Sequence, residues 1–197
     1  MKIAVFFDRD GTLNVEKGYI RDVAEVELIP GAAHAVRSLN DAGFLCILTS
    51  NQTGAARGYY SLEHIHALNN RVMELLRKEA GAWLDAVYFC PHYENGTVAE
   101  YAHPCDCRKP EPGMIYRAKQ EFPDIDLQNS FVVGDKASDI AFAQNAGCRG
   151  ILVRTGYGES VLSGTYQTLE VQPEAICTDI TEAVAYILAQ QQGATAK

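Results

Sequence analysis

Short apolar runs alternate along this chain with longer segments in which apolar residues recur every three or four positions. The short runs are rich in β-branched and aromatic residues and stop at polar residues or glycine, which is typical of buried strands. The longer segments have the spacing of amphipathic helices. The predicted strands cover residues 3–7, 44–48, 86–89, 131–133, 151–153 and 175–177. The predicted helices cover residues 32–42, 62–76, 113–122, 138–146 and about 181–191.

Strands that alternate with helices in this order predict an α/β fold. Right-handed crossovers then give a doubly wound, mainly parallel sheet with helices on both faces, as in Rossmann-like folds. The length of 197 residues suits one domain, which we expect to cover residues 1–197. Neither long connection is large enough to fold alone, so no large cap domain is expected.

Composition narrows the range of partners. The net charge of −8 and the pI near 5.1 argue against binding of nucleic acids or of anionic membranes. No apolar stretch is long enough to cross a bilayer, and the first apolar run is too short for a signal peptide. We therefore expect a cytoplasmic, monomeric protein with a small-molecule substrate. An anionic substrate would need a metal or a few well-placed cations.

Two carboxylates, Asp8 and Asp10, follow the first predicted strand directly and precede Gly11. Residues two apart in extended backbone point to the same side, so both carboxylates can converge on one small volume. Such neighbours repel each other unless a cation lies between them or one is protonated. The carboxyl ends of parallel strands are also where open α/β sheets bind ligands. The alternative is a solvated turn, because Asp and Gly are common turn residues.

Other predicted strand ends carry related chemistry. The second strand ends near Ser50 and Asn51, and the fourth ends at Asp135. Lys109 lies just before a predicted helix of the same crossover layer. Carboxylates suit Mg²⁺, whereas a hydroxyl and an ammonium suit phosphoryl oxygens. We predict a divalent-metal site beside a phosphate site; two further polar residues at this edge are Lys136 and Asp139.

This set of residues resembles a known family in both order and spacing. The matching motifs are Asp8-x-Asp10-Gly11-Thr12, Ser50 after an apolar strand, Lys109, and Gly134-Asp135-x-x-x-Asp139. They resemble the four motifs of the haloacid dehalogenase-like phosphohydrolases, and the resemblance covers nearly the whole chain.

The resemblance implies a role for each motif. Asp8 would be the nucleophile that forms an aspartyl-phosphate, and Asp10 would be the general acid and base. Mg²⁺ would be held by Asp8, Asp135 and the backbone carbonyl of Asp10. Ser50 and Lys109 would stabilise the phosphoryl oxygens. The supporting residues would be Thr12 and Asp139, the latter by orienting Lys136 or Lys109.

A second candidate metal site lies in the long irregular segment 90–112. Cys90 and His92 give a C-x-H pair, and Cys105 and Cys107 give a C-x-C pair. A Cys₃His set suits tetrahedral Zn²⁺ in a closed structural site. The alternatives are four unligated side chains in a mobile loop, or His103 as the fourth ligand. A coil of this length needs something to order it, which favours a zinc-stapled loop at about residues 90–110.

The same loop bears on the choice of substrate. It resembles a subfamily that contains heptose-bisphosphate phosphatases and histidinol-phosphate phosphatases, and segments 14–19 and 51–58 resemble the substrate loops of the former. This likeness implies a phosphorylated sugar, with histidinol phosphate as the alternative. A second phosphate would need its own cation, supplied by Arg57 or Arg108. The expected substrate-binding residues are Asn14, Gly18, Tyr19, Asn51, Gln52, Arg57, Arg108 and Lys136.

A signalling receiver module is the competing interpretation from another class. It also combines a doubly wound sheet, an acidic cluster, Mg²⁺ and a phosphorylated Asp. Its acceptor Asp would follow the third strand, where this chain has Cys90. The order of the motifs therefore favours the phosphohydrolase.

Overall fold

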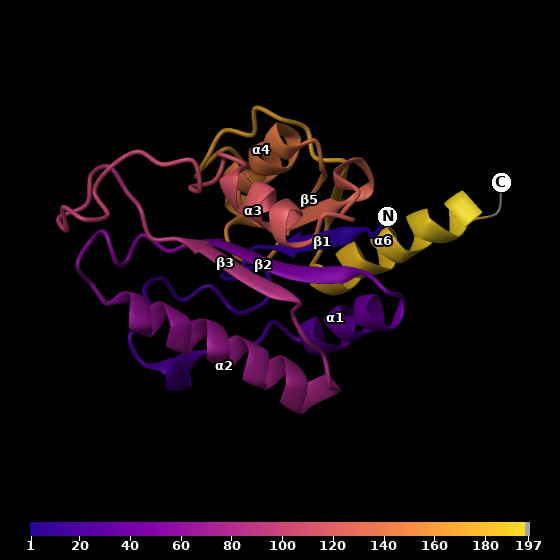
Figure 1. Cartoon of the computed structure of the whole chain (residues 1–197), viewed down its shortest axis with the longest axis horizontal. Helices are drawn as coiled ribbons and strands as arrows, with labels where there is room; N and C mark the ends of the chain where they lie inside the picture. The colour runs from indigo at the N-terminus through magenta and orange to yellow at the C-terminus, as the bar shows by residue number, and fades with distance from the viewer. Residues whose placement is uncertain (196–197) are drawn as a thin grey trace.

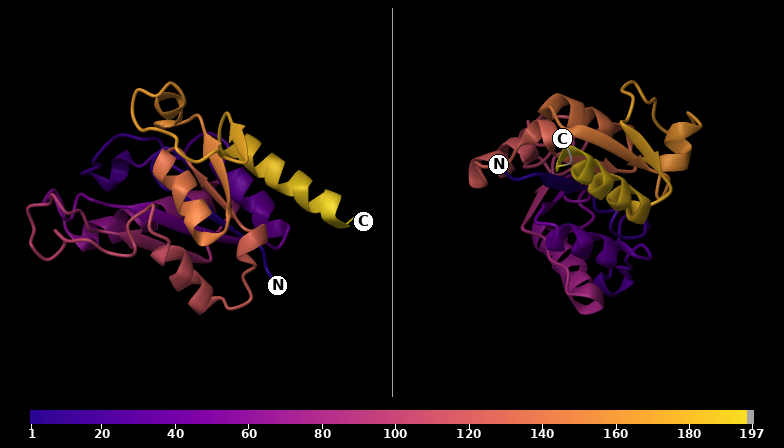
Figure 2. Two further views of the ribbon diagram at one scale, coloured as in Figure 1. Left: turned by 90° about the horizontal axis from the view of Figure 1, so that it is seen from above. Right: turned by 90° about the vertical axis from the view of Figure 1, so that its right-hand side faces the viewer.

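A six-stranded, all-parallel sheet forms the centre of the molecule (Figures 1 and 2). The computed structural model describes residues 1–195. The strands lie in the order β3-β2-β1-β4-β5-β6, which confirms the predicted doubly wound topology. Their bounds are β1 Ala4–Phe7, β2 Leu45–Asn51, β3 Ala86–Cys90, β4 Phe131–Gly134, β5 Arg149–Val153 and β6 Ala175–Cys177.

Helices cover both faces of this sheet (Figure 1). One face carries α1 (Ala32–Asp41), α2 (Leu62–Ala80) and α6 (Ile180–Thr195), and the other carries α3 (Gly113–Glu121) and α4 (Ala137–Ala146). Successive strand residues point to opposite faces. Val5 and Phe7 therefore pack with the first group of helices, whereas Ala4 and Phe6 pack with the second.

At its carboxyl end, β2 is longer than the apolar pattern predicts. β2 continues through the polar residues Ser50 and Asn51, which pair with Phe89 and Cys90 of β3. The strand continues because β3 supplies backbone partners beyond the last apolar residue. Ser50 and Asn51 are consequently fixed by the sheet instead of lying in a free loop. The helix α5 (Gly158–Leu162) is too short to show a periodic pattern and was not predicted.

The connections after the strands gather at one end of the molecule, to the left in Figure 1, and the long loop after β3 extends beside those after β1 and β2. In the described residues, these connections contain no second sheet or helical cap. No helix in residues 1–195 has the length and apolar character needed to cross a membrane.

Candidate active site

Asp8 lies at the carboxyl end of β1, where its backbone N–H donates to the carbonyl of Val133 at 2.9 Å. Its buried carboxylate accepts from Lys109 Nζ at 3.0 Å and from Lys136 Nζ at 3.4 Å. Burial opposes ionisation of Asp8, but the two ammonium groups outweigh it and lower its pKa to about 2. Asp8 is therefore held as a carboxylate at neutral pH.

Lys109 is only 3% exposed and is fixed from several directions. Its ammonium donates to Asp139 Oδ1 at 2.7 Å as well as to Asp8. The Asn51 amide accepts from the Lys109 backbone N–H at 3.0 Å and donates to the Lys109 carbonyl at 3.2 Å. Asp139 also accepts from the backbone N–H of Lys136 at the start of α4. The expected orienting role of Asp139 thus corresponds to direct contacts with both lysines.

Asp135 follows β4 and is completely buried. It accepts from Lys136 Nζ at 2.9 Å and from the Tyr157 backbone N–H at 2.8 Å. A side chain at Gly11 or Gly156 would place its Cβ within 2.2 Å of Asp135 Oδ2, so this close packing requires glycine at both positions. Burial raises the pKa of Asp135 to about 7 despite the nearby Lys136.

These carboxylates fit a divalent cation. Oxygens of Asp8, Asp135 and Asp139 lie within 4.8 Å of one another, and all three residues are buried. Both oxygens of Asp139 are occupied by Lys109 and by the backbone of Lys136. Lys136 Nζ bridges Asp8 Oδ2 and Asp135 Oδ1, so a divalent ion would compete with this ammonium for those two oxygens.

Asp10 has a different environment from Asp8. Arg9 donates to both of its oxygens, at 3.2 and 2.8 Å, and Asn14 and Gln52 donate at 3.0 and 2.9 Å. Gln52 Nε2 also donates to Ser50 Oγ at 2.8 Å and so connects Asp10 with the expected phosphate-binding hydroxyl. Each oxygen of the Asp10 carboxylate thus accepts two hydrogen bonds from these side chains.

Arg9 was not among the predicted site residues, although it lies between the two carboxylates. It is 2% exposed and also donates to Asn69 of α2 at 3.0 Å. A buried arginine needs ionic and polar partners, and its position between Asp8 and Asp10 was the available signal. Arg9 fixes the orientation of the Asp10 carboxylate.

A cavity of about 360 Å³ lies over these groups. Most expected substrate contacts border it, but Asn14 and Arg57 do not. Asn14 is buried and donates to Asp10 instead, and Thr12 is buried beneath the loop. Predicted site residues that line the cavity are Asp8, Asp10, Gly18, Tyr19, Ser50, Asn51, Gln52, Arg108, Lys109, Lys136 and Asp139.

The segment after β5 contributes a wall that was not predicted. Tyr157, Tyr166 and Gln167 line the cavity, and the two tyrosine rings stack with centroids 4.3 Å apart. β5 ends at the same sheet edge as β1 and β4, so the topology alone pointed to this connection. Tyr19 also lines the cavity, and its hydroxyl is 3.2 Å from Thr53 Oγ1.

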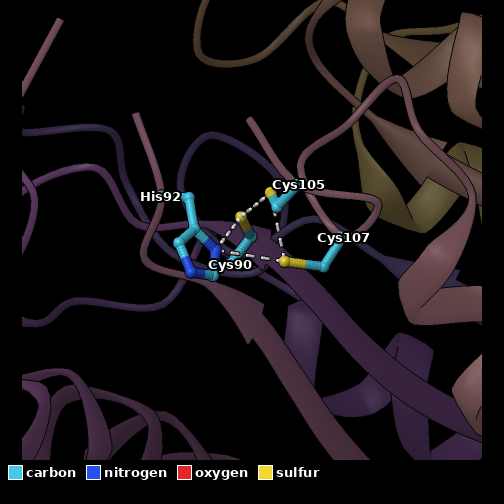
Figure 3. A group of neighbouring side chains, drawn as sticks. All are labelled: Cys90, His92, Cys105 and Cys107. Atoms are coloured by element: carbon cyan, nitrogen blue, oxygen red, sulfur yellow. Dashed lines mark hydrogen bonds between the residues drawn. The ribbon is translucent and has the colours of Figure 1, made fainter. Parts of the chain in front are cut away.

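Cys90, His92, Cys105 and Cys107 converge in the loop after β3 (Figure 3). Cys90 Sγ is 3.5 Å from both His92 Nδ1 and Cys105 Sγ, and Cys107 Sγ is 3.4 Å from the same two atoms. Tetrahedral zinc with bonds of about 2.0–2.3 Å requires ligand separations of about 3.5 Å, so this set fits Zn²⁺.

Two further features agree with a zinc site. His103, the alternative ligand, hydrogen-bonds through its ring nitrogens to the backbone carbonyls of Pro104 and Glu100. The hydrogen bond with Cys90 lowers the pKa of Cys107 to about 5, whereas the pKa of Cys90 is raised. The thiols share protons that a bound cation would displace.

A family model described as HAD-hydrolase-like matches residues 106–183. The chain is 55% identical over 187 residues to a D-glycero-D-manno-heptose-1,7-bisphosphate 7-phosphatase of Thermosynechococcus vestitus, covering 93% of this chain and 94% of the relative. It is 41% identical over 180 residues to a D-glycero-beta-D-manno-heptose-1,7-bisphosphate 7-phosphatase of Yersinia pestis, covering 88% and 94%.

Solved structures give a consistent comparison. A D,D-heptose 1,7-bisphosphate phosphatase from B. bronchiseptica, complexed with magnesium and phosphate, superposes with a TM-score of 0.82 at 29% identity, covering 96% of this chain and 99% of that one. A putative HAD-like phosphatase from Mesorhizobium loti superposes with a TM-score of 0.79 at 37% identity, covering 95% and 85%.

Removal of zinc should loosen the loop after β3 while leaving the sheet folded, because the four zinc ligands are the main cross-link of that loop. Selective chelation in the presence of Mg²⁺ should make residues 91–106 sensitive to limited proteolysis and weaken binding of inorganic phosphate, measured by calorimetry. Removing only Mg²⁺ is the control and should leave the proteolysis pattern unchanged. Full turnover of a phosphate ester by zinc-stripped protein supplied with Mg²⁺ alone would contradict the expectation that the ordered loop positions Arg108 and Lys109.

Proposed function

The chain belongs to the haloacid dehalogenase-like hydrolases, and we propose that it is a Mg²⁺-dependent phosphatase that removes the 7-phosphate of D-glycero-D-manno-heptose 1,7-bisphosphate. The observation that carries the reaction type is the convergence of Asp8, Lys109 and Asp135 at one end of the sheet, with Ser50 beside them at the cavity. The relatives named above support the choice of sugar.

The proposed reaction begins at Asp8. One oxygen of its carboxylate attacks phosphorus, and the bond from phosphorus to the sugar oxygen breaks. Asp8 is suited to this step because its low pKa keeps it ionised. Lys109 and Ser50 would hold the phosphoryl oxygens, while Asn51 and Asp139 keep the Lys109 side chain in place.

Asp10 would move the protons. It would donate a proton to the leaving sugar oxygen and then accept one from the water that hydrolyses the aspartyl-phosphate. Arg9, Asn14 and Gln52 hold its carboxylate in one orientation beside the cavity. Glu16 also borders this cavity, where burial raises its pKa.

Mg²⁺, when bound to Asp8, Asp135 and the backbone carbonyl of Asp10, would neutralise the repulsion between the carboxylates and the phosphate. The zinc cluster has no comparable access to the reaction, because its four side chains complete a tetrahedral set. We assign it the structural role of ordering the segment that carries Arg108 and Lys109.

We further propose that residues 1–197 form one phosphohydrolase domain that acts as a monomer in the cytoplasm. None of the six cysteines forms a disulfide, which is typical of a reducing compartment. Light scattering and fractionation of cells test these two proposals.

Substrate comparison tests the proposed specificity. Values of kcat/KM for the α- and β-anomers of heptose 1,7-bisphosphate should exceed that for histidinol phosphate by about 100-fold or more. The second phosphate of the sugar suits a cationic partner, whereas the amine and imidazole of histidinol phosphate do not. A higher value for histidinol phosphate would overturn the assignment. A stable phosphoprotein without turnover of any ester would instead favour the receiver interpretation.

Replacing the nucleophile should abolish turnover. Asp8→Asn retains the shape of the side chain but cannot form the aspartyl-phosphate, so no ³²P should become bound to the protein and steady-state activity should be lost. Asp124→Asn makes the same chemical change at an exposed residue beside the amino end of β1 and should behave like the unmodified chain. Measurable turnover by purified Asp8→Asn would refute the nucleophile assignment.

Asp10→Asn should slow both half-reactions by about 10²–10⁴-fold, the usual contribution of general acid–base catalysis. Rapid-quench measurements separate formation of the phosphoenzyme from its breakdown. If breakdown proceeds at the original rate, the role of Asp10 as the base is wrong.

A further inference from the structure

Two arginines from separate segments meet at the ring of Tyr93. The guanidinium carbon of Arg57 lies 4.2 Å from the ring centroid, and that of Arg108 lies 5.3 Å from it. Arg57 belongs to the connection after β2. Tyr93 directly follows the zinc ligand His92, and Arg108 directly follows the zinc ligand Cys107. The face of an aromatic ring attracts cations, so Tyr93 holds both groups near one point.

The two guanidiniums have no carboxylate partner among the salt bridges of residues 1–195. The buried Nε of Arg57 also lacks a hydrogen-bond partner. Two adjacent cations without counter-charge are unusual in a chain whose net charge is −8. Their combined field favours an anion beside them.

The loop contacts fix this arrangement. Thr97 and Val98 donate their backbone N–H groups to the Ala56 carbonyl at 2.7 and 2.9 Å, which joins the zinc loop to the residue before Arg57. A Cβ at Gly96 would lie 2.5 Å from the same carbonyl oxygen, so the close approach requires glycine. Arg108 Nη1 donates to the carbonyl of His92 at 3.2 Å.

Of Arg57, Tyr93 and Arg108, only Arg108 lines the cavity, which Lys109, Tyr19 and Thr53 also border. We propose that Tyr93 is a positioning residue that, together with Arg57, holds Arg108 where it binds the second, non-reacting phosphate of the substrate. This inference rests on the proposed function and deepens it. It also gives Arg57 an indirect role in place of the direct phosphate contact expected from the sequence.

The chemistry agrees with this division of roles. Lys109 and Lys136 are engaged by the catalytic carboxylates, so neither is free for a second dianion. Arg108 can offer two parallel N–H donors to a phosphate, a geometry that a lysine lacks. A substrate with one phosphate has no group for Arg108 and should be indifferent to Tyr93.

The test uses the full-length enzyme loaded with zinc and magnesium. Tyr93→Leu should raise KM for heptose 1,7-bisphosphate about tenfold, leave kcat within about twofold, and leave KM for heptose 7-phosphate unchanged. Tyr93→Phe keeps the ring face and should match the unmodified chain with both substrates. Equal changes with both substrates, or no change with either, would overturn the inference.

A double-mutant cycle tests whether Tyr93 acts through Arg108. In an Arg108→Met background, Tyr93→Leu should produce no further rise in KM for the bisphosphate, whereas additive effects would contradict the inference. Zinc content is measured for every variant. If Tyr93→Leu loses zinc, Arg57→Leu serves as the deciding variant, because Arg57 lies outside the zinc loop. Arg57→Leu should raise KM for the bisphosphate selectively, as expected for Tyr93→Leu. An unchanged KM for the bisphosphate would overturn the inference.

The outcomes distinguish the proposed phosphatase function from the positioning role of Tyr93. An unmodified chain that does not turn over the bisphosphate overturns both of them. Turnover by the unmodified chain with unselective variants overturns only the role of Tyr93.

Discussion

The ammonium of Lys109 lies in the interior between the carboxylates of Asp8 and Asp139. Buried carboxylates are stable only with partners, and removing one member of such a set commonly costs about 3–5 kcal/mol. Asp8 directly follows β1, Asp139 belongs to α4, and Lys109 lies in the loop after β3. One buried ionic contact therefore connects the two central strand ends with a segment that has no regular structure of its own.

The need to hold Lys109 in this buried ionic contact explains how the loop after β3 is built. A long irregular segment loses much conformational entropy when it is ordered, so it needs contacts that hold it against the sheet edge. Asn51 brackets the Lys109 backbone with two hydrogen bonds, and the Cys₃His cluster cross-links the loop to the end of β3. The same loop carries Arg108, which lines the cavity. The proposed recognition of the substrate would therefore depend on the contacts that order the loop.

The two carboxylates of the first loop differ through their neighbours. Asp8 faces lysine ammonium groups, whereas Asp10 faces Arg9 and two side-chain amides. These different partners suit the two acids to the separate roles proposed for them. Gln52 connects these surroundings, because its amide nitrogen donates to both Asp10 and Ser50. In the proposed reaction, these two hydrogen bonds would couple phosphate binding to the position of the acid–base group.

The sequence by itself determined the parallel sheet, the edge at which Asp8, Ser50 and Asp135 gather, and the Cys90–Cys107 ligand set. Alternation and short spacings fix strand direction and side-chain orientation locally, so these features needed no knowledge of distant contacts. Only the tertiary structure decided that Asn14 turns toward Asp10, that Arg9 reaches Asn69, that Arg57 meets Tyr93, and that the connection after β5 closes one wall. These outcomes depend on which polar groups come close enough to contact each other. Those groups include residues far apart in the sequence, so the packing of the segments decides which contacts form.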